Sequence, residues 1–255
     1  MFNRTEKVSR ETLDMGNKLH QLDKAELQHQ LKEIWKTVST SGTPSSGLEK
    51  QAPSTLSSQQ PLGPDDFEVR WVEKLWIHYS EVCKWNPRLS LIGPGTGAEI
   101  VERHYGESLA GLGFLSKADR TVIDIGSGGG FPGWVLAAVL PKVQFRLIEP
   151  REKKWVFLQT CIRKAALLSC EAVNARVEAP LPSALDLPKS IDVVTSRALA
   201  LPAEILEVIA AHSPGLRFLF WVGKEEIALP TGYRVCRSQP LSDSRYRRIV
   251  ELVPT

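Results

Sequence analysis

Glycines and a single carboxylate follow an apolar run in the middle of the chain, and these residue types suit a ligand-binding turn. Residues 121–133 read Thr-Val-Ile-Asp-Ile-Gly-Ser-Gly-Gly-Gly-Phe-Pro-Gly. The apolar residues are typical of a strand covered on both faces, and the glycines allow a tight turn with close backbone approach to a ligand. Pro132 suits the first turn of a following helix, whose free N–H groups favour electron-rich atoms. The segment therefore predicts a nucleotide-cofactor loop.

The spacing of the glycines matches two classes of cofactor. Gly128, Gly130 and Gly133 satisfy the dinucleotide fingerprint G-x-G-x-x-G. Glu149 lies about 20 residues further on, where an acid would meet a ribose. A dinucleotide is therefore one interpretation of the loop.

Two further residues favour S-adenosylmethionine over a dinucleotide. Asp124 and Gly126, with the later glycines, give the pattern D-x-G-x-G-x-G, which the dinucleotide fingerprint does not need. S-adenosylmethionine has no pyrophosphate to cradle, so the first glycines can pass its methionine moiety while the acid addresses the amino group. A turn without any ligand is the third interpretation, and it is disfavoured because this many glycines cost backbone entropy.

Glu149 is the second candidate carboxylate. It ends the predicted strand 143–149 and is followed by Pro150 and a predicted basic helix over residues 151–158. A carboxylate offers two acceptor oxygens, which suits the two neighbouring hydroxyls of a ribose. The alternative is an ordinary acid at a helix N-terminus that offsets the helix dipole.

Alternating strand and helix patterns must position these residues. They continue through residues 117–255 and predict a doubly wound α/β sheet, whose last two strands fit an antiparallel edge. In such folds a ligand lies beyond the carboxyl ends of the strands. Asp124, Glu149 and Arg197 are all expected at that end.

The chain before the sheet divides into three expected parts. Residues 1–38 contain an amphipathic helical extension, because apolar residues recur near helical spacing, and it packs either on the domain or on a partner. Residues 39–64 are mostly Ser, Thr, Pro, Gly and Gln, which predicts a disordered linker. Residues 65–116 are expected to form a helical cap, with its first helix ended by Asn86-Pro87.

Composition bounds the class of protein. The chain has 255 residues, a hydrophobic fraction of 42% and a formal net charge of +3, which permits nucleic-acid binding without demonstrating it. Neither a signal-peptide core nor an apolar run of about 20 residues is present, so we expect a cytoplasmic protein without a membrane segment. The four scattered cysteines predict no zinc or other metal site, and we expect them to be buried small apolar residues. A monomer is expected.

A basic cluster near the end of the chain has two interpretations. Residues 242–248 place three arginines beside Tyr246, which suits phosphate contact and base stacking. A charged turn before the last strand explains the same residues equally well.

Six separated motifs, in chain order, resemble a known family. They are Lys84-Trp85-Asn86, residues 103–109, the loop 124–133, residues 147–158, Arg176-Val177-Glu178 and Ser196-Arg197-Ala198. Together they resemble the RsmG (GidB) methyltransferases, which methylate the N7 of a guanine in 16S ribosomal RNA with S-adenosylmethionine. The resemblance implies a Rossmann-like class I methyltransferase fold, S-adenosylmethionine as cofactor, and 16S rRNA or the small ribosomal subunit as partner.

The resemblance also implies roles for individual residues. In the family the R-x-E element binds the adenine end of the cofactor, and the arginine of S-R-A belongs to the cofactor and substrate site. The expected cofactor-binding residues are Asp124, Gly126, Ser127, Gly128, Gly130, Phe131, Glu149, Val177, Glu178 and Arg197. Arg197 is also the candidate catalytic residue, because a guanidinium can orient a guanine or its phosphate.

Two departures from the family pattern keep other functions open. Ser90-Leu91-Ile92 stands where the family has N-L-T, and Gly223-Lys224-Glu225 stands where it has K-G. One alternative is a methyltransferase of the same fold retargeted to another RNA or a small molecule. The other is a noncatalytic RNA-binding module for ribosome assembly.

Overall fold

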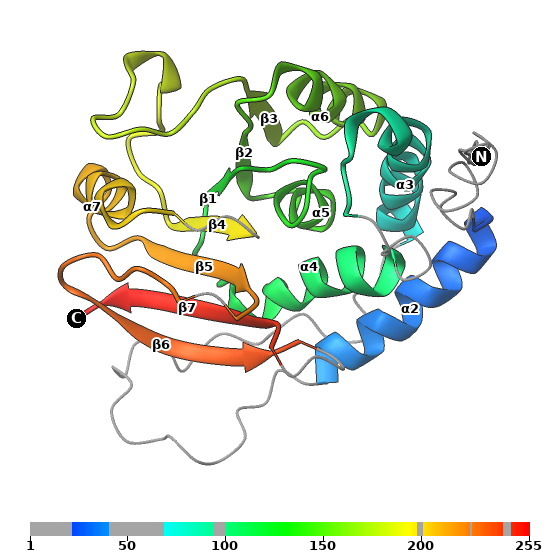
Figure 1. Cartoon of the computed structure of the whole chain (residues 1–255). Helices are drawn as coiled ribbons and strands as arrows, with labels where there is room; N and C mark the ends of the chain where they lie inside the picture. Colours follow the sequence, from blue (N-terminus) through cyan, green and yellow to red (C-terminus); the bar gives the residue numbers. More distant parts are fainter. Residues whose placement is uncertain (1–21, 41–68, 94–99, 198–200, 225, 242–245) are drawn as a thin grey trace, which may run out of the picture.

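A seven-stranded sheet forms the centre of the molecule (Figure 1). The computed structural model describes residues 22–40, 69–93, 100–197, 201–224, 226–241 and 246–255. Its strands are β1 (Thr121–Ile125), β2 (Gln144–Ile148), β3 (Cys170–Val173), β4 (Val193–Arg197), β5 (Arg217–Val222), β6 (Tyr233–Pro240) and β7 (Arg248–Pro254). The first five are parallel, and β7 pairs antiparallel with both β5 and β6, so the expected antiparallel edge is confirmed.

The strand order places a switch point between β1 and β4. The order is β3-β2-β1-β4-β5-β7-β6, so the chain first runs outward from β1 to β3 and then returns to pair β4 beside β1. Ligands in doubly wound folds bind beyond the carboxyl ends of the strands at such a reversal. Asp124 on β1 and Arg197 at the end of β4 flank this point.

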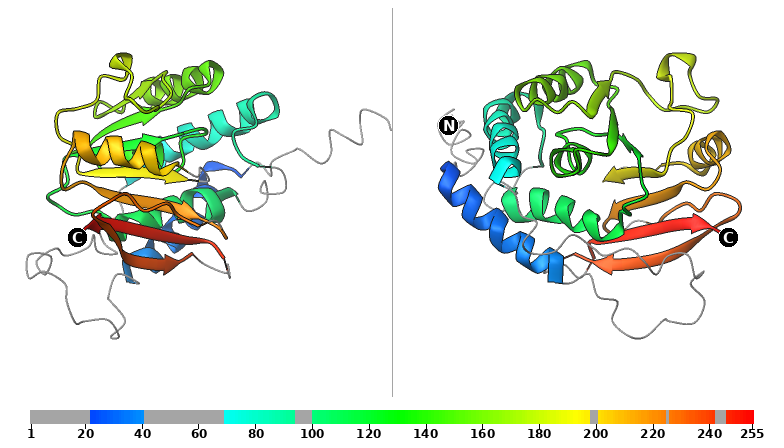
Figure 2. Two further views of the ribbon diagram at one scale, coloured as in Figure 1. Left: turned by 60° about the vertical axis from the view of Figure 1, so that its left-hand side comes forward. Right: turned by 180° about the vertical axis from the view of Figure 1, so that it is seen from behind.

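Helices cover both faces of the sheet, so the predicted doubly wound arrangement is confirmed. One face, with Val122 and Leu147, packs against α5 (Gly133–Val139), α6 (Glu152–Lys164) and α3 (Val69–Leu89). The opposite face packs against α7 (Ala203–His212) and the short 3-10 helix η4 (Ser183–Leu185). Figure 2 shows α7 on the side of the sheet away from α3 and α6.

Beyond α5, the first face carries a helical cap. Residues 100–114 form one irregular helical segment composed of the π-helical turn η2 (Val101–Gly106), α4 (Glu107–Leu109) and the 3-10 turn η3 (Ala110–Phe114). The π-helical turn has one residue more per hydrogen-bonded ring than an α-helix, and such turns occur frequently at functional sites. The segment lies at the end of the sheet that carries the glycine loop (Figure 1).

The N-terminal helix α2 (Lys24–Thr40) packs on α3 and on this cap, where Ile34 lies against Gly106. Leu27, Leu31 and Trp35 are fully or almost fully buried, and the rings of Trp35 and Trp71 are 4.9 Å apart. The backbone N–H of Leu22 donates to the Tyr79 hydroxyl at 2.8 Å. Of the two possibilities left open by the sequence, the described helix therefore packs on its own domain.

Two sequence-based expectations are wrong in detail. Helix α3 continues through Pro87 to Leu89 because the Asn86 carbonyl still accepts a hydrogen bond from Ser90 N–H, and positive φ at Ser90 ends the helix there. Cys236 is exposed on edge strand β6 instead of buried, because the strand leaves this face uncovered. The expected linker lies outside the described residues from residue 41 onward.

Candidate active site

The glycine loop connects β1 to α5 through backbone conformations that favour glycine. Gly126, Gly128 and Gly130 have φ values of 74°, 53° and 90°, in the region that side chains rarely adopt. A Cβ on Gly133 would lie 2.5 Å from the Cβ of Asp124, so glycine allows α5 to pack closely on β1. Helix α5 begins one residue after Pro132, close to the predicted position.

The Asp124 carboxylate lies beneath this loop and is only partly satisfied. Asp124 is 1% exposed, and its Oδ1 accepts a hydrogen bond of 2.7 Å from the Thr195 hydroxyl of β4. Its Oδ2 is buried and has no hydrogen-bond partner among the described residues. Burial raises the pKa of Asp124 to about 6, and the nearby Glu149 charge acts in the same direction. An unpartnered acidic oxygen of this kind can accept a cationic or N–H donor group from a ligand.

Glu149 lies directly after β2 and supports the loop from the other side. The residue is 4% exposed. Its Oε2 accepts a hydrogen bond from Gly128 N–H at 2.9 Å, and its Oε1 accepts one from Arg151 N–H at 2.8 Å. A carboxylate offers about four lone-pair positions, so about two remain for a ligand. The carboxylate is therefore both a structural support of the turn and a candidate for binding two hydroxyls.

Arg197 ends β4 and belongs to a charged cluster with the cap. Its Nη2 donates to the Arg103 carbonyl at 2.7 Å and to Glu107 Oε2 at 2.6 Å. Glu107 Oε1 accepts a second hydrogen bond from Arg247 Nε at 2.7 Å. Arg197 Nη1 is buried and has no hydrogen-bond partner among the described residues, so it can still donate to a ligand.

Glu107 is the site residue that sequence reasoning missed. It occurs in one of the family-like motifs, but the spacing gave no sign that its carboxylate would join arginines 90 and 140 residues away. Its side chain is 3% exposed, and its own carbonyl accepts a hydrogen bond from Trp221 Nε1 at 2.6 Å. The sequence did offer one signal for this role, because Glu107 is a charged residue among the apolar positions of the cap helix.

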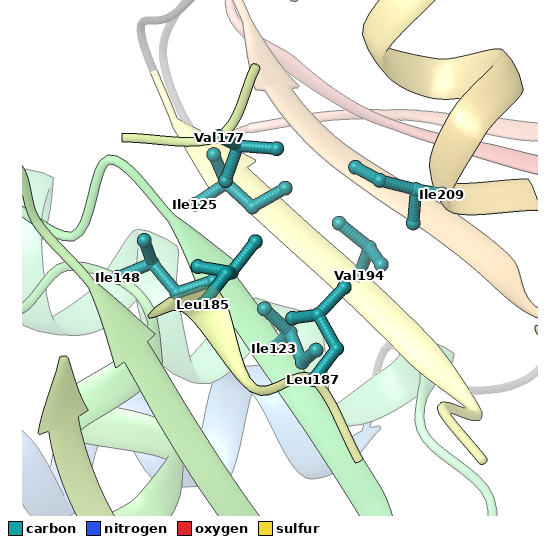
Figure 3. Close-up of a pocket in the computed structure, with 8 residues that line it drawn as sticks. All are labelled: Ile123, Ile125, Ile148, Val177, Leu185, Leu187, Val194 and Ile209. Atoms are coloured by element: carbon teal, nitrogen blue, oxygen red, sulfur yellow. The ribbon is translucent and has the colours of Figure 1, made fainter. Parts of the chain in front are cut away.

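Val177 and Glu178, two further expected site residues, differ in their surroundings. Val177 lies over the last residues of β1 and β2, where it lines a small apolar pocket with Ile125 and Ile148 (Figure 3). Glu178 is exposed, with an oxygen 3.9 Å from Arg176 Nε. The complete lining of the pocket is Ile123, Ile125, Ile148, Val177, Leu185, Leu187, Val194 and Ile209.

Phe131 and Ser127 complete the loop. The buried Phe131 ring lies 5.0 Å from the His104 ring and so contacts the cap. Burial, followed by the neighbouring charges of Arg197 and other arginines, lowers the pKa of His104 to about 3, so this imidazole is neutral at pH 7. The Ser127 hydroxyl donates to the Asp124 carbonyl at 2.9 Å.

The described His, Cys, Asp and Glu residues form no group of 3 or more that could hold a metal ion.

Comparison with known proteins shows which family this chain belongs to. The model of the GidB family, described as rRNA small subunit methyltransferase G, matches residues 72–243 of this chain. The chain belongs to this family. The matched residues include the glycine loop, Glu149, Glu107 and Arg197, whereas α2 lies before them. The doubly wound sheet is accordingly a Rossmann-like class I methyltransferase fold.

Individual relatives agree with the GidB match. The chain is 34% identical over 200 residues to ribosomal RNA small subunit methyltransferase G of Wolinella succinogenes, covering 76% of this chain and 96% of the relative. It is 35% identical over 161 residues to the protein of the same name from Desulfotalea psychrophila, covering 61% and 73%. A SAM-dependent methyltransferase structure from Aquifex aeolicus aligns with a TM-score of 0.47 at 19% identity, covering 62% of this chain and 94% of that chain. Among the helices described by the structure, none combines the length and the hydrophobicity that a membrane span requires.

Proposed function

We propose that this protein transfers a methyl group from S-adenosylmethionine to the N7 of a guanine in 16S ribosomal RNA. The observation that carries the proposal is the GidB match over residues 72–243, because it includes the glycine loop, Glu149 and Arg197 in one family pattern. The relatives at 34% and 35% identity carry the name ribosomal RNA small subunit methyltransferase G. The substrate is accordingly proposed to be 16S rRNA, free or in the small ribosomal subunit, and the site of action the cytoplasm.

The residues beneath and beside the glycine loop fit this cofactor. The unpartnered Oδ2 of Asp124 suits the cationic amino group of the methionine moiety, directly or through water. Glu149 uses about half of its lone-pair positions on backbone N–H groups, and the others suit the two ribose hydroxyls. Val177 and Glu178 are proposed to meet the adenine end, because Val177 lies beside Ile125 and Ile148, the last residues of β1 and β2, and Glu178 follows it in the chain.

The chemistry needs orientation more than proton transfer. The bound cofactor supplies an electrophilic methyl group on a sulfonium. Guanine N7 carries a lone pair and no proton, so the protein needs no general base. Holding the two reactants in line can lower the barrier by several kcal/mol, up to about 7–11 at the ideal limit. Burial lowers the pKa of His104 to about 3, so this imidazole is a weak base in the site.

The charged cluster at the end of β4 suits an anionic substrate. The guanidinium groups of Arg103, Arg197 and Arg247 lie near one another, and the Glu107 carboxylate pairs with two of them. Clustered guanidinium groups of this kind attract a phosphate backbone. Arg197 Nη1 is proposed to donate to the guanine O6 or to a neighbouring phosphate.

The direct test is to map N7-methylated guanines. Purified protein and methyl-labelled S-adenosylmethionine are incubated with small ribosomal subunits or with free 16S rRNA from a deletion strain. We expect label in one guanine, found by cleavage specific for N7-methylguanosine. The Arg197→Ala variant should lose this label, whereas Arg120→Ala, an exposed arginine at the amino-terminal edge of the sheet, should keep it. The proposal fails if ribosomes from the deletion strain carry all their N7-methylguanines, or if purified wild-type protein labels neither RNA.

A further inference from the structure

One buried residue of α3 contacts the backbone of the glycine loop directly. His78 lies on α3 and is fully buried. Its Nε2 is 2.9 Å from the carbonyl oxygen of Gly129, and its Nδ1 is 2.8 Å from the hydroxyl of Tyr105. Helix α3, the π-helical turn η2 and the loop are therefore joined through one imidazole.

The two partners determine which imidazole nitrogen carries the proton. The Gly129 carbonyl can only accept, so Nε2 carries the hydrogen and donates it. Nδ1 is then an acceptor, and the Tyr105 hydroxyl donates to it. Burial lowers the pKa of His78 to about 3, so the ring stays neutral and this arrangement persists across the pH range of an enzyme assay. The result is a chain of two hydrogen bonds in which Tyr105 donates to His78 and His78 donates to Gly129.

Packing around the ring leaves it little freedom. The imidazole stacks on Trp134 of α5 with centroids 4.3 Å apart and planes 17° apart. Its edge faces Phe131, with centroids 5.2 Å apart. A Cβ on Gly130 would lie 2.9 Å from Nε2, so the loop approaches the ring as closely as glycine allows. His78 therefore holds a defined position against the loop.

The loop is thus held from two sides at successive residues. Glu149 accepts from the N–H of Gly128, and His78 donates to the carbonyl of Gly129. Each bond fixes the direction of one peptide plane, and together they select one conformation of a turn whose glycines could adopt many. A ligand that binds the turn then loses less conformational freedom on binding.

We propose that His78 is a positioning residue for the methyl donor, which acts by fixing the Gly129 peptide, with Tyr105 fixing the histidine tautomer. The inference rests on the proposed function, because it takes S-adenosylmethionine as the ligand of the loop. Because His78 is fully buried and contacts the loop backbone, it acts through the loop and not on a ligand directly. Its removal should weaken cofactor binding and raise the KM for S-adenosylmethionine, while kcat at saturating cofactor changes little.

The test compares cofactor affinity in variants that change one or two hydrogen bonds. His78→Phe keeps a buried ring and loses both bonds, and Tyr105→Phe loses only one hydroxyl. His78→Gln can still donate from near the Nε2 position and should restore part of the affinity. The matched control is Tyr79→Phe, which removes a hydroxyl from the same helix at its contact with Leu22, away from the loop.

Calorimetric titration with S-adenosylmethionine gives the primary readout. We expect His78→Phe to raise the Kd about tenfold and Tyr105→Phe about threefold, from the usual net strength of buried hydrogen bonds. Tyr79→Phe should lower thermal stability as much as Tyr105→Phe does but leave the Kd unchanged. Amide hydrogen exchange at the loop of the cofactor-free protein should be faster in His78→Phe and Tyr105→Phe than in the control.

The outcomes separate this inference from the proposed function. If wild-type protein binds S-adenosylmethionine but both variants bind within about twofold of it, His78 is only a core residue and the inference is wrong. If wild-type protein shows no binding, both the inference and the proposed cofactor fall. If His78→Phe does not fold, Tyr105→Phe decides, because it removes a single oxygen and leaves every ring in place.

Discussion

The buried Asp124 carboxylate should make cofactor binding depend on pH. Its pKa is raised from 3.8 to about 6, chiefly by burial, so the cofactor-free site is mostly protonated at pH 5 and ionised at pH 8. A cationic amino group needs the ionised form. With a pKa of about 6, roughly nine-tenths of the protein is protonated at about pH 5, which weakens the apparent affinity roughly tenfold relative to about pH 8.

The Asp124 carboxylate should also make the free energy of unfolding depend on pH. Because the pKa in the folded state is above the unfolded value, protonation of Asp124 stabilises the fold fully below pH 3.8 and this contribution is lost as the pH rises through about 6. A difference of roughly two pKa units corresponds to about 3 kcal/mol. Wild-type protein should therefore become less stable relative to Asp124→Asn by about 3 kcal/mol between about pH 3 and pH 7.

Asp124→Asn tests both consequences with almost no change in shape. Its amide oxygen can still accept the Thr195 hydroxyl, but no charge remains. Calorimetric titration from about pH 5 to pH 8 should show weaker binding of S-adenosylmethionine by the variant and no Asp124-dependent change in its Kd. Urea unfolding over a wider range of pH measures the stability difference.

A control at the opposite edge of the sheet, Asp192 directly before β4, guards against general effects of charge. Asp192 accepts hydrogen bonds from the N–H groups of Arg120 and Thr121 at the amino-terminal edge of β1. Asp192→Asn should keep the wild-type dependence of Kd on pH. A wild-type Kd that is constant over this range, or an Asp124→Asn variant that binds as tightly as wild type, would refute the assigned role of Asp124.

Three other substitutions have defined expectations. Arg197→Ala should abolish methyl transfer but keep the circular dichroism of the fold. We expect it to lower the free energy of unfolding by about 1–3 kcal/mol, because a second arginine still pairs with Glu107. Full turnover of this variant would show that the role of the arginine is misassigned. Gly130→Ala should destabilise the protein by about 1–3 kcal/mol and weaken cofactor binding, because its φ is 90° and its Cβ would meet atoms at 2.8 and 2.9 Å; Gly113→Ala, with nothing within 4 Å, is the neutral control. Trp35→Ala should lower the free energy of unfolding in urea by about 3–5 kcal/mol, and a negligible loss would contradict the packing of α2 on the cap.

Much of the fold was predictable because its signals are local. The run from β1 into the glycine loop carries its own strand and turn propensities, and the alternation of strands and helices continues to the end of the chain. The family resemblance is confirmed by the match over residues 72–243. The roles of Asp124, Glu149, Val177 and Glu178 toward the cofactor stay predictions.

The errors in the sequence-based expectations arise where tertiary contacts override local propensity. Proline disfavours the helical interior, yet α3 continues through Pro87 because the chain beyond it still forms a helical hydrogen bond to Asn86. The segment 100–114 contains a π-helical turn, which changes which of its side chains share a face. No hydrophobic pattern in one sequence encodes that single extra residue.

The sequence by itself determined the sheet, the glycine loop and the two acids at the strand ends, because backbone propensity and hydrophobic spacing act between near neighbours. Only the tertiary structure decided which charges meet: Glu107 joins Arg197 across 90 residues and Arg247 across 140. It likewise placed His78 against Gly129, 51 residues away. Buried polar groups require partners at hydrogen-bond distance, and those partners are chosen by how helices pack on the sheet and not by their spacing along the chain.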